Sequence, residues 1–149
     1  MRIGVPKEIK SNENRVGLVP SSVGELVRHG HGVIVETGAG DGIGAGDAAY
    51  QAAGAIIAPT ADAVFAGADL IIKVKEPQPV EIARLTPAHT LFTYLHLAPD
   101  PDQAKGLLAS GSTAIAYETV TDARGRLPLL TPMSEVAGRM AVQVGAHCL

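Results

Sequence analysis

Short apolar runs rich in β-branched residues alternate with helix-forming segments along the chain, and this alternation is the strongest constraint on its fold. The runs occupy residues 2–6, 32–36, 54–58, 69–74, 90–95 and 112–118. They are almost continuously apolar, as "GVIVE" and "DLIIKV" illustrate, which is typical of strands covered on both faces. We therefore predict a sheet with other elements packed on each side.

Helical patterns fill the intervals between these runs. Ser22 and Glu25 have the spacing of a capping box, and Gly30 fits the residue that ends this first helix. Further helices are predicted at 47–53, 60–66, 79–85 and 101–109. Alternating β and α units favour parallel strands joined by crossover helices. The predicted fold class is α/β, a Rossmann-like three-layer domain with a mostly parallel sheet and helices on both faces.

The last helical pattern starts at Thr131-Pro132 and is still running at Leu149. Its apolar positions recur at helical spacing and comprise Met133, Val136, Ala137, Met140, Ala141, Val144 and Cys148. Because no signal for a helix end precedes Leu149, we expect this segment to be the start of something longer. A terminal helix docked on its own domain is the alternative.

Composition narrows the functional classes. A chain of 149 residues fits one domain with a sizeable core, which must be aliphatic because only 3% of the residues are aromatic. The net charge is -3, and the scattered Lys and Arg form no basic stripe, which argues against nucleic acid as a partner. Cys148 has no disulfide partner, and no apolar run approaches the roughly 20 residues of a membrane span. We therefore expect a cytoplasmic protein.

The glycine-rich segment "ETGAGDGIGAGDAAY" invites comparison with a phosphate-binding loop. Two frames, 40–45 and 44–49, fit G-x-G-x-x-[GA], and Asp62 lies 20 positions beyond Gly42, where a ribose-binding acid could sit. However, a segment this rich in glycine will match the pattern by chance, and neither frame begins at the end of the preceding strand. We favour a rim loop whose glycines let backbones approach closely.

Three cations stand where a ligand could bind. Arg15 lies in the polar loop "SNENRVGLVP" and could grip a carboxylate through two parallel N–H bonds. Lys73 and Lys75 end a strongly apolar run, and ligands of open α/β sheets bind beyond the carboxyl ends of strands. Arg15 and the two lysines, Lys73 and Lys75, are therefore candidates for holding an anionic ligand. The alternatives are a solvated surface arginine and a lysine snorkelling at the sheet edge.

His96 in "TYLHLAPD" follows the next apolar run, and Tyr94 shares its face if the extended geometry continues. A histidine can both donate and accept a proton near neutral pH, so His96 is the candidate acid or base. A packed or surface histidine is the alternative. No His, Cys, Asp and Glu cluster has the spacing of metal ligands, so we predict no metal site. The other histidines are interpreted as surface or packing residues: His29, His31, His89 and His147.

Several segments together resemble the amino-terminal part of bacterial alanine dehydrogenases. They are "MRIGVPKEIKSNENRVGLVPSSVGELVRHGHGVIVETGAGDGIG", "IIKVKEPQP", "FTYLHLAPD" and "LTPMSEVAGRMAVQVGAHCL". The resemblance extends over essentially all 149 residues. The nicotinamide nucleotide transhydrogenase α subunit has a similar opening and glycine-rich loop, but "TYLHLAP" is similar to the dehydrogenase branch.

The resemblance implies reversible, NAD-dependent oxidative deamination of L-alanine to pyruvate and ammonium. The family's substrate-binding positions match Arg15, Lys75 and Tyr94. The position of its acid or base matches His96. Met133 and Ser134 match positions at the domain junction, close to the bound nicotinamide.

The chain departs from the family in length, because family members are more than twice as long. The resemblance implies that residues 1–130 form an incomplete substrate (catalytic) domain and that 131–149 start an inter-domain helix. NAD would be bound mainly by a domain absent from this chain, which we expect to be inactive alone. Family members form homo-oligomers, typically hexamers. A free-standing 2-oxo acid binding or regulatory module and a transhydrogenase α-subunit-like protein remain alternatives.

Overall fold

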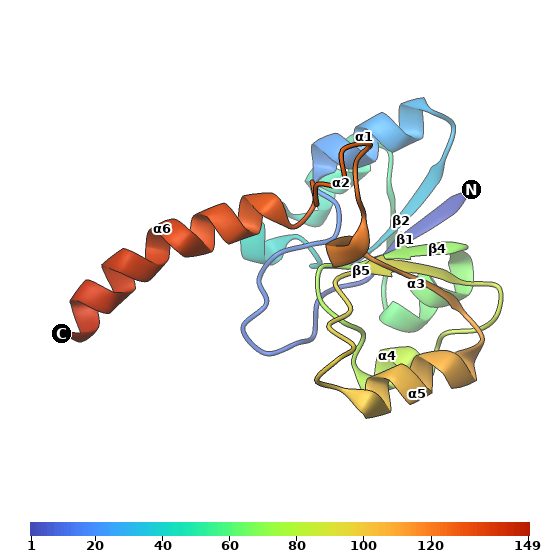
Figure 1. Cartoon of the computed structure of the whole chain (residues 1–149). Coiled ribbons are helices and arrows are strands. Elements are labelled where there is room, and N and C mark those ends of the chain that lie inside the picture. Colours follow the sequence, from blue (N-terminus) through green and yellow to red (C-terminus); the bar gives the residue numbers. More distant parts are fainter. The chain divides into compact units, whose positions relative to one another are not determined.

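The computed structural model describes residues 1–149 and contains one six-stranded sheet with helices (Figure 1). The strands are β1 (Arg2–Val5), β2 (Gly32–Glu36), β3 (Ile56–Ala58), β4 (Leu70–Ile72), β5 (Thr90–Thr93) and β6 (Thr113–Ala116). The helices are α1 (Pro20–Arg28), η1 (Asp41–Ile43), α2 (Asp47–Ala52), α3 (Ala61–Gly67), α4 (Pro79–Ile82), α5 (Pro101–Ser110), η2 (Tyr117–Thr119) and α6 (Thr131–Cys148). The chain divides into two units, Met1–Ile115 and Ala116–Leu149.

The strands follow the order β3-β2-β1-β4-β5-β6. β1 pairs in parallel with both β2 and β4, with Ile3 opposite Val33 on one side and Leu70 on the other. β2 with β3 and β4 with β5 are also parallel. The chain thus builds outward from β1 in one direction, then returns and builds in the other, which places a topological switch point between β1 and β4. The predicted α/β class with a parallel sheet is confirmed.

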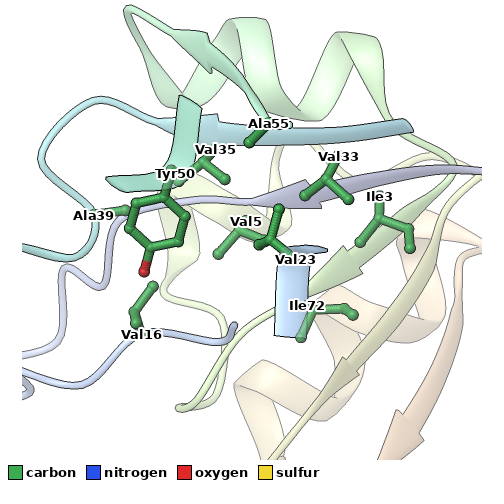
Figure 2. Packing of buried hydrophobic residues seen from close by; sticks show 10 residues of the cluster. All are labelled: Ile3, Val5, Val16, Val23, Val33, Val35, Ala39, Tyr50, Ala55 and Ile72. Carbon is green, nitrogen blue, oxygen red and sulfur yellow. The ribbon is translucent and has the colours of Figure 1, made fainter. Parts of the chain in front are cut away.

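One face of the sheet packs against α1 and α2. Alternation along the strands points Ile3, Val5, Val33 and Val35 to this side, where Val23 of α1 meets them. The buried cluster is aliphatic apart from one aromatic residue and consists of Ile3, Val5, Val16, Val23, Val33, Val35, Ala39, Tyr50, Ala55 and Ile72 (Figure 2). The core therefore has the aliphatic character that the composition predicts.

The other face is covered by α3. A Cβ added to Gly4 would lie 2.8 Å from the Cβ of Ala68 and 2.9 Å from Cγ1 of Val64, so the glycine lets this helix sit close on β1. His89 is buried, and its Nε2 lies 3.0 Å from the carbonyl oxygen of Phe65. The interpretation of His89 as a packing residue is confirmed. With elements on both faces, the first unit has the predicted three layers.

The start of α1 corrects one prediction. The helix begins at Pro20 and has no side-chain cap, so the capping box predicted for Ser22 and Glu25 is wrong. Proline fixes φ in the helical range and suits the first position, which leaves Ser22 inside the first turn. The end is as predicted, since Gly30 has φ 81° and donates to the carbonyl oxygen of Val27 at 2.9 Å.

The second unit consists of η2, an irregular segment and α6. Asp122 organises the segment by accepting from the backbone N–H and Nε of Arg126 at 2.9 Å and 2.7 Å. The helix predicted from Thr131 is confirmed and ends at Cys148. No helix in the chain has both the length and the hydropathy that crossing a membrane requires. The functional boundary expected after residue 130 stays a prediction.

Candidate functional site at the switch point

The candidate residues follow three strands that are neighbours in the middle of the sheet. Arg15 lies in the loop after β1, Lys75 follows β4, and Tyr94 and His96 follow β5. Because β1, β4 and β5 are adjacent and parallel, their carboxyl ends meet at one edge. This edge is where open α/β sheets bind ligands, and the loops with Arg15 and Lys75 leave the sheet on the two sides of the switch point.

Arg15 is engaged by Glu13, which the sequence reasoning missed. Arg15 Nε donates to Oε1 of Glu13 at 2.8 Å, and its terminal nitrogen donates to Oε2 at 2.6 Å. This side-chain bond is the main cause that lowers the pKa of Glu13 from 4.5 to about 2, and it raises the pKa of Arg15. The Arg15 side chain is 49% exposed. A ligand carboxylate would therefore have to share or displace Glu13.

Lys75 is near the same carboxylate but does not bind it. The residue is partly buried, and its ammonium takes part in none of the ion pairs of the structure. Its charge makes the smallest of the contributions that lower the pKa of Glu13. The phenol of Tyr94 in turn contributes to raising the pKa of Arg15. These couplings tie Arg15, Lys75 and Tyr94 to one locality.

Tyr94 and His96 lie together, as predicted, although not for the predicted reason. Their rings are stacked with centroids 6.2 Å apart and an angle of 19° between planes. The extended geometry does not continue, because β5 ends at Thr93 and His96 has φ 47°. A left-handed backbone is uncommon in residues other than glycine and is found disproportionately at functional sites. His96 is exposed while Tyr94 is buried, so the imidazole is the accessible partner.

Lys73 does not belong to the accessible part of the site. Its Nζ lies 3.1 Å from Oε2 of Glu8 and 2.8 Å from Oε1 of Glu81. The three side chains are exposed by only 1%, 2% and 2%. The alternative of a lysine snorkelling at the sheet edge is therefore wrong for Lys73, which is the centre of a buried group of one ammonium and two carboxylates. We call Lys73, Glu8 and Glu81 the buried triad.

The glycine-rich loop packs on the segment that carries Arg15. A Cβ at Gly42 would lie 2.2 Å from the carbonyl oxygen of Asn14, and one at Gly40 would lie 2.3 Å from that of Ala45. Protein backbone thus fills the space that a pyrophosphate would need at these glycines, which supports the rim-loop interpretation. A cavity of about 190 Å³ lies between this loop and the Glu13–Arg15 segment. A larger cavity of about 570 Å³ beside α4 and α5 includes none of the four candidate residues.

Met133 and Ser134 lie in the first turn of α6, in the second unit. The hydroxyl of Ser134 donates to the carbonyl oxygen of Leu130 at 3.4 Å. Their expected place at a domain junction stays a prediction. The structure holds no group of three or more His, Cys, Asp and Glu side chains placed to bind one metal ion.

Comparison with known proteins identifies many relatives. The chain is 58% identical over 149 residues to an alanine dehydrogenase of Halomonas elongata. It is 55% identical to one of Mycolicibacterium smegmatis and 56% identical to one of Bacillus subtilis, again over 149 residues. Each match covers 100% of this chain but only 40%, 40% and 39% of the respective relative. The chain thus spans about 40% of the length of these relatives.

Solved structures agree with this relationship. An L-alanine dehydrogenase structure matches 99% of the chain with a TM-score of 0.92 and 52% identity, and the match covers 40% of that protein. A transhydrogenase from Sinorhizobium meliloti is more distant, with a TM-score of 0.77 and 30% identity over 83% of this chain and 37% of that one. The family model described as "Alanine dehydrogenase/PNT, N-terminal domain" matches residues 4–137. The chain therefore belongs to the alanine dehydrogenase/PNT N-terminal domain family.

Proposed function

We propose that this chain is the substrate-binding part of an NAD-dependent alanine dehydrogenase. In the overall reaction, L-alanine, NAD⁺ and water give pyruvate, ammonium, NADH and a proton. The observation that carries the proposal is the convergence of Arg15, Lys75 and His96 at the carboxyl ends of three adjacent strands, beside the switch point. Two cations and one exposed imidazole suit a small 2-oxo or 2-amino acid better than a neutral or cationic ligand.

Each residue has a role that follows from its chemistry and surroundings. Arg15 binds the substrate carboxylate through its planar fork, in exchange for Glu13. Lys75, whose ammonium takes part in none of the ion pairs, faces the carbonyl oxygen of pyruvate. His96 moves protons when the imine formed from alanine is hydrolysed, and Tyr94 supports the imidazole by stacking beneath it.

NAD is not expected to be held by the residues of this chain. At Gly40 and Gly42 the glycine-rich loop is packed against the backbone of Ala45 and Asn14, which leaves no cradle for a pyrophosphate in the frame 40–45. We propose that the cofactor is bound mainly by a part of the parent protein outside residues 1–149, with Met133 and Ser134 close to the nicotinamide. The family resemblance further implies a cytoplasmic homo-oligomer, which size-exclusion chromatography of the parent protein would test.

Ligand binding by the 149-residue chain tests the assignment of this domain. We expect isothermal titration calorimetry to detect binding of pyruvate and little binding of NADH. Acetate, which has the carboxylate but no 2-oxo group, is the matched control and should bind more weakly. A folded sample that binds NADH tightly and ignores pyruvate would contradict the proposal.

The role of His96 requires an active enzyme. A chimera would join residues 1–149 to the part of the Halomonas elongata relative that lies beyond the matched region. Since general acid–base catalysis typically contributes about 10²–10⁴-fold, His96→Ala should reduce kcat by that order. His29→Ala, at an exposed turn, is the control and should leave kcat unchanged. Undiminished turnover in His96→Ala would remove the acid–base role and favour a binding module.

A further inference from the structure

Lys75 lies beyond the end of β4, and two side chains hold the backbone there. β4 ends at Ile72, where the last regular pair joins it to Phe92 of β5. Beyond this point Tyr94 N–H still donates to the carbonyl oxygen of Val74 at 3.2 Å. The next carbonyl, that of Lys75, accepts from the hydroxyl of Thr93 at 2.8 Å. A side chain thus replaces the strand partner at the residue that matters for the site.

Glu8 fixes the same segment from the opposite side. Its Oε1 accepts from the backbone N–H of Val74 at 2.6 Å, while its Oε2 pairs with Lys73 at 3.1 Å. The Glu8 side chain is 2% exposed, so this carboxylate has been taken out of water to make these two contacts. The N–H of Val74 is therefore held by Glu8 of the loop after β1, and the carbonyl group of Lys75 is held by Thr93 of β5.

Thr93 has a feature that core packing does not explain. It is fully buried, and a valine of nearly the same shape would fill its space without a polar atom. Its hydroxyl donates a hydrogen bond to the carbonyl oxygen of Lys75. The bond satisfies the carbonyl oxygen of Lys75, and it also restricts where the backbone, and with it the Lys75 side chain, can lie.

We propose that Thr93, acting with Glu8, is a positioning residue that fixes the Lys75 ammonium for the ligand. The inference rests on the proposed function, because it needs Lys75 to contact the substrate. Thr93 itself touches no substrate in this arrangement. Its hydroxyl acts through the backbone of Lys75, and Tyr94 and His96, which follow directly, share the same anchor on β5.

A pair of matched variants separates positioning from packing. Thr93→Val keeps the volume and removes the hydroxyl, whereas Thr93→Ser keeps the hydroxyl and removes a buried methyl group. Loss of one hydrogen bond predicts pyruvate binding about three- to tenfold weaker in Thr93→Val and nearly unchanged in Thr93→Ser, measured by calorimetry on the 149-residue chain. Thermal unfolding should show a loss of stability in both variants, because Thr93→Val leaves the carbonyl oxygen of Lys75 without its partner and Thr93→Ser loses a buried methyl group. Pyruvate binding is therefore the measurement that separates the two variants.

A double-mutant cycle with Lys75→Met completes the test. If Thr93 acts through Lys75, Thr93→Val should cause no further loss of affinity once the ammonium is gone. Equal losses in the presence and absence of Lys75, or an unchanged affinity of Thr93→Val, would overturn the positioning role while leaving the proposed function intact. A wild-type chain that does not bind pyruvate would overturn both.

Discussion

Two ion-paired groups follow strands at the same edge of the sheet and differ in how far water reaches them. One is the Arg15–Glu13 pair, and the other is the buried triad. In the Arg15–Glu13 pair the Arg15 side chain is 49% exposed and that of Glu13 only 5%, whereas all three side chains of the buried triad are exposed by at most 2%. The exposed side of the Arg15 guanidinium can take on a ligand carboxylate at little cost, because water already reaches it. A buried group cannot do so, because each unpaired charge would remain in a medium of low dielectric constant. Similar chemistry therefore provides an exchangeable ligand contact in one place and a fixed anchor in the other.

The extra negative charge of the triad is balanced by the backbone. Glu8 Oε1 accepts from Val74 N–H at 2.6 Å, and Glu81 Oε2 accepts from Gln78 N–H at 2.8 Å. Both carboxylates are thus fully occupied between Lys73 and a peptide group. The triad also connects the loop after β1, the end of β4 and the helix α4.

The largest expected effect is on stability when the triad is broken. Lys73→Met would leave two buried carboxylates facing each other, and we expect the free energy of unfolding to fall by about 3–5 kcal/mol in urea denaturation. The control is Lys105→Met, which breaks the pair with Asp102 whose side chains are 76% and 89% exposed. It should change the free energy by less than about 1 kcal/mol. Equal changes in both variants would contradict the contrast drawn from burial.

Substitution of the half-exposed Arg15 should show the opposite profile, with a large effect on binding and a small one on stability. Arg15→Lys keeps the charge but loses the planar fork, so we expect pyruvate affinity to fall roughly tenfold in calorimetry. The free energy of unfolding should change by less than about 1 kcal/mol. Arg28→Lys, on α1 beside Glu25, is the control and should bind like the wild type. Unchanged affinity in Arg15→Lys would argue against a two-pronged carboxylate contact.

The contribution of the Arg15–Glu13 pair to the free energy of unfolding should depend on pH. The folded pKa of Glu13 is about 2 and its ordinary value is 4.5, so its ionisation stabilises the fold above pH 4.5, and this contribution is lost as the pH falls towards 2. The difference in unfolding free energy between the wild type and Glu13→Gln should therefore be present at neutral pH and vanish over that window. Because Arg15 is half exposed, we expect no more than about 1 kcal/mol. A pH-independent difference would contradict this assignment.

The fold could be predicted from the sequence because its strands are covered on both faces. Residues 32–36, for example, are nearly all apolar and could hardly be anything other than a buried strand, and the pattern repeats with helices between. Helix starts were harder. At α1 the proline at position 20 outweighs the capping-box spacing of Ser22 and Glu25, since both signals occur within one turn.

The candidate site was only partly predictable. Lys75 and His96 stand close to the ends of apolar runs, and Arg15 stands in the polar loop that follows another, which a linear pattern reveals. The buried triad could not be predicted, because it depends on Glu8 and Glu81 arriving from distant elements at Lys73. For Glu13 a local signal existed in the Glu-x-Arg spacing of "NENR", but whether such neighbours pair depends on how the loop after β1 folds.

The smallest expected effect concerns what Glu13 does for the ligand. Glu13→Gln removes a negative charge from the fork of Arg15 and from the vicinity of Lys75, so a ligand carboxylate would displace a neutral amide instead of a competing anion. Since partly exposed pairs are worth about 0.2–1 kcal/mol, pyruvate should bind roughly two- to fivefold more tightly. Glu25→Gln on α1 serves as the control without effect on binding. Weaker binding in Glu13→Gln would mean that Glu13 orients Arg15 for the ligand rather than competing with the ligand. The Arg15–Glu13 pair would then act as a fixed support, as the buried triad does.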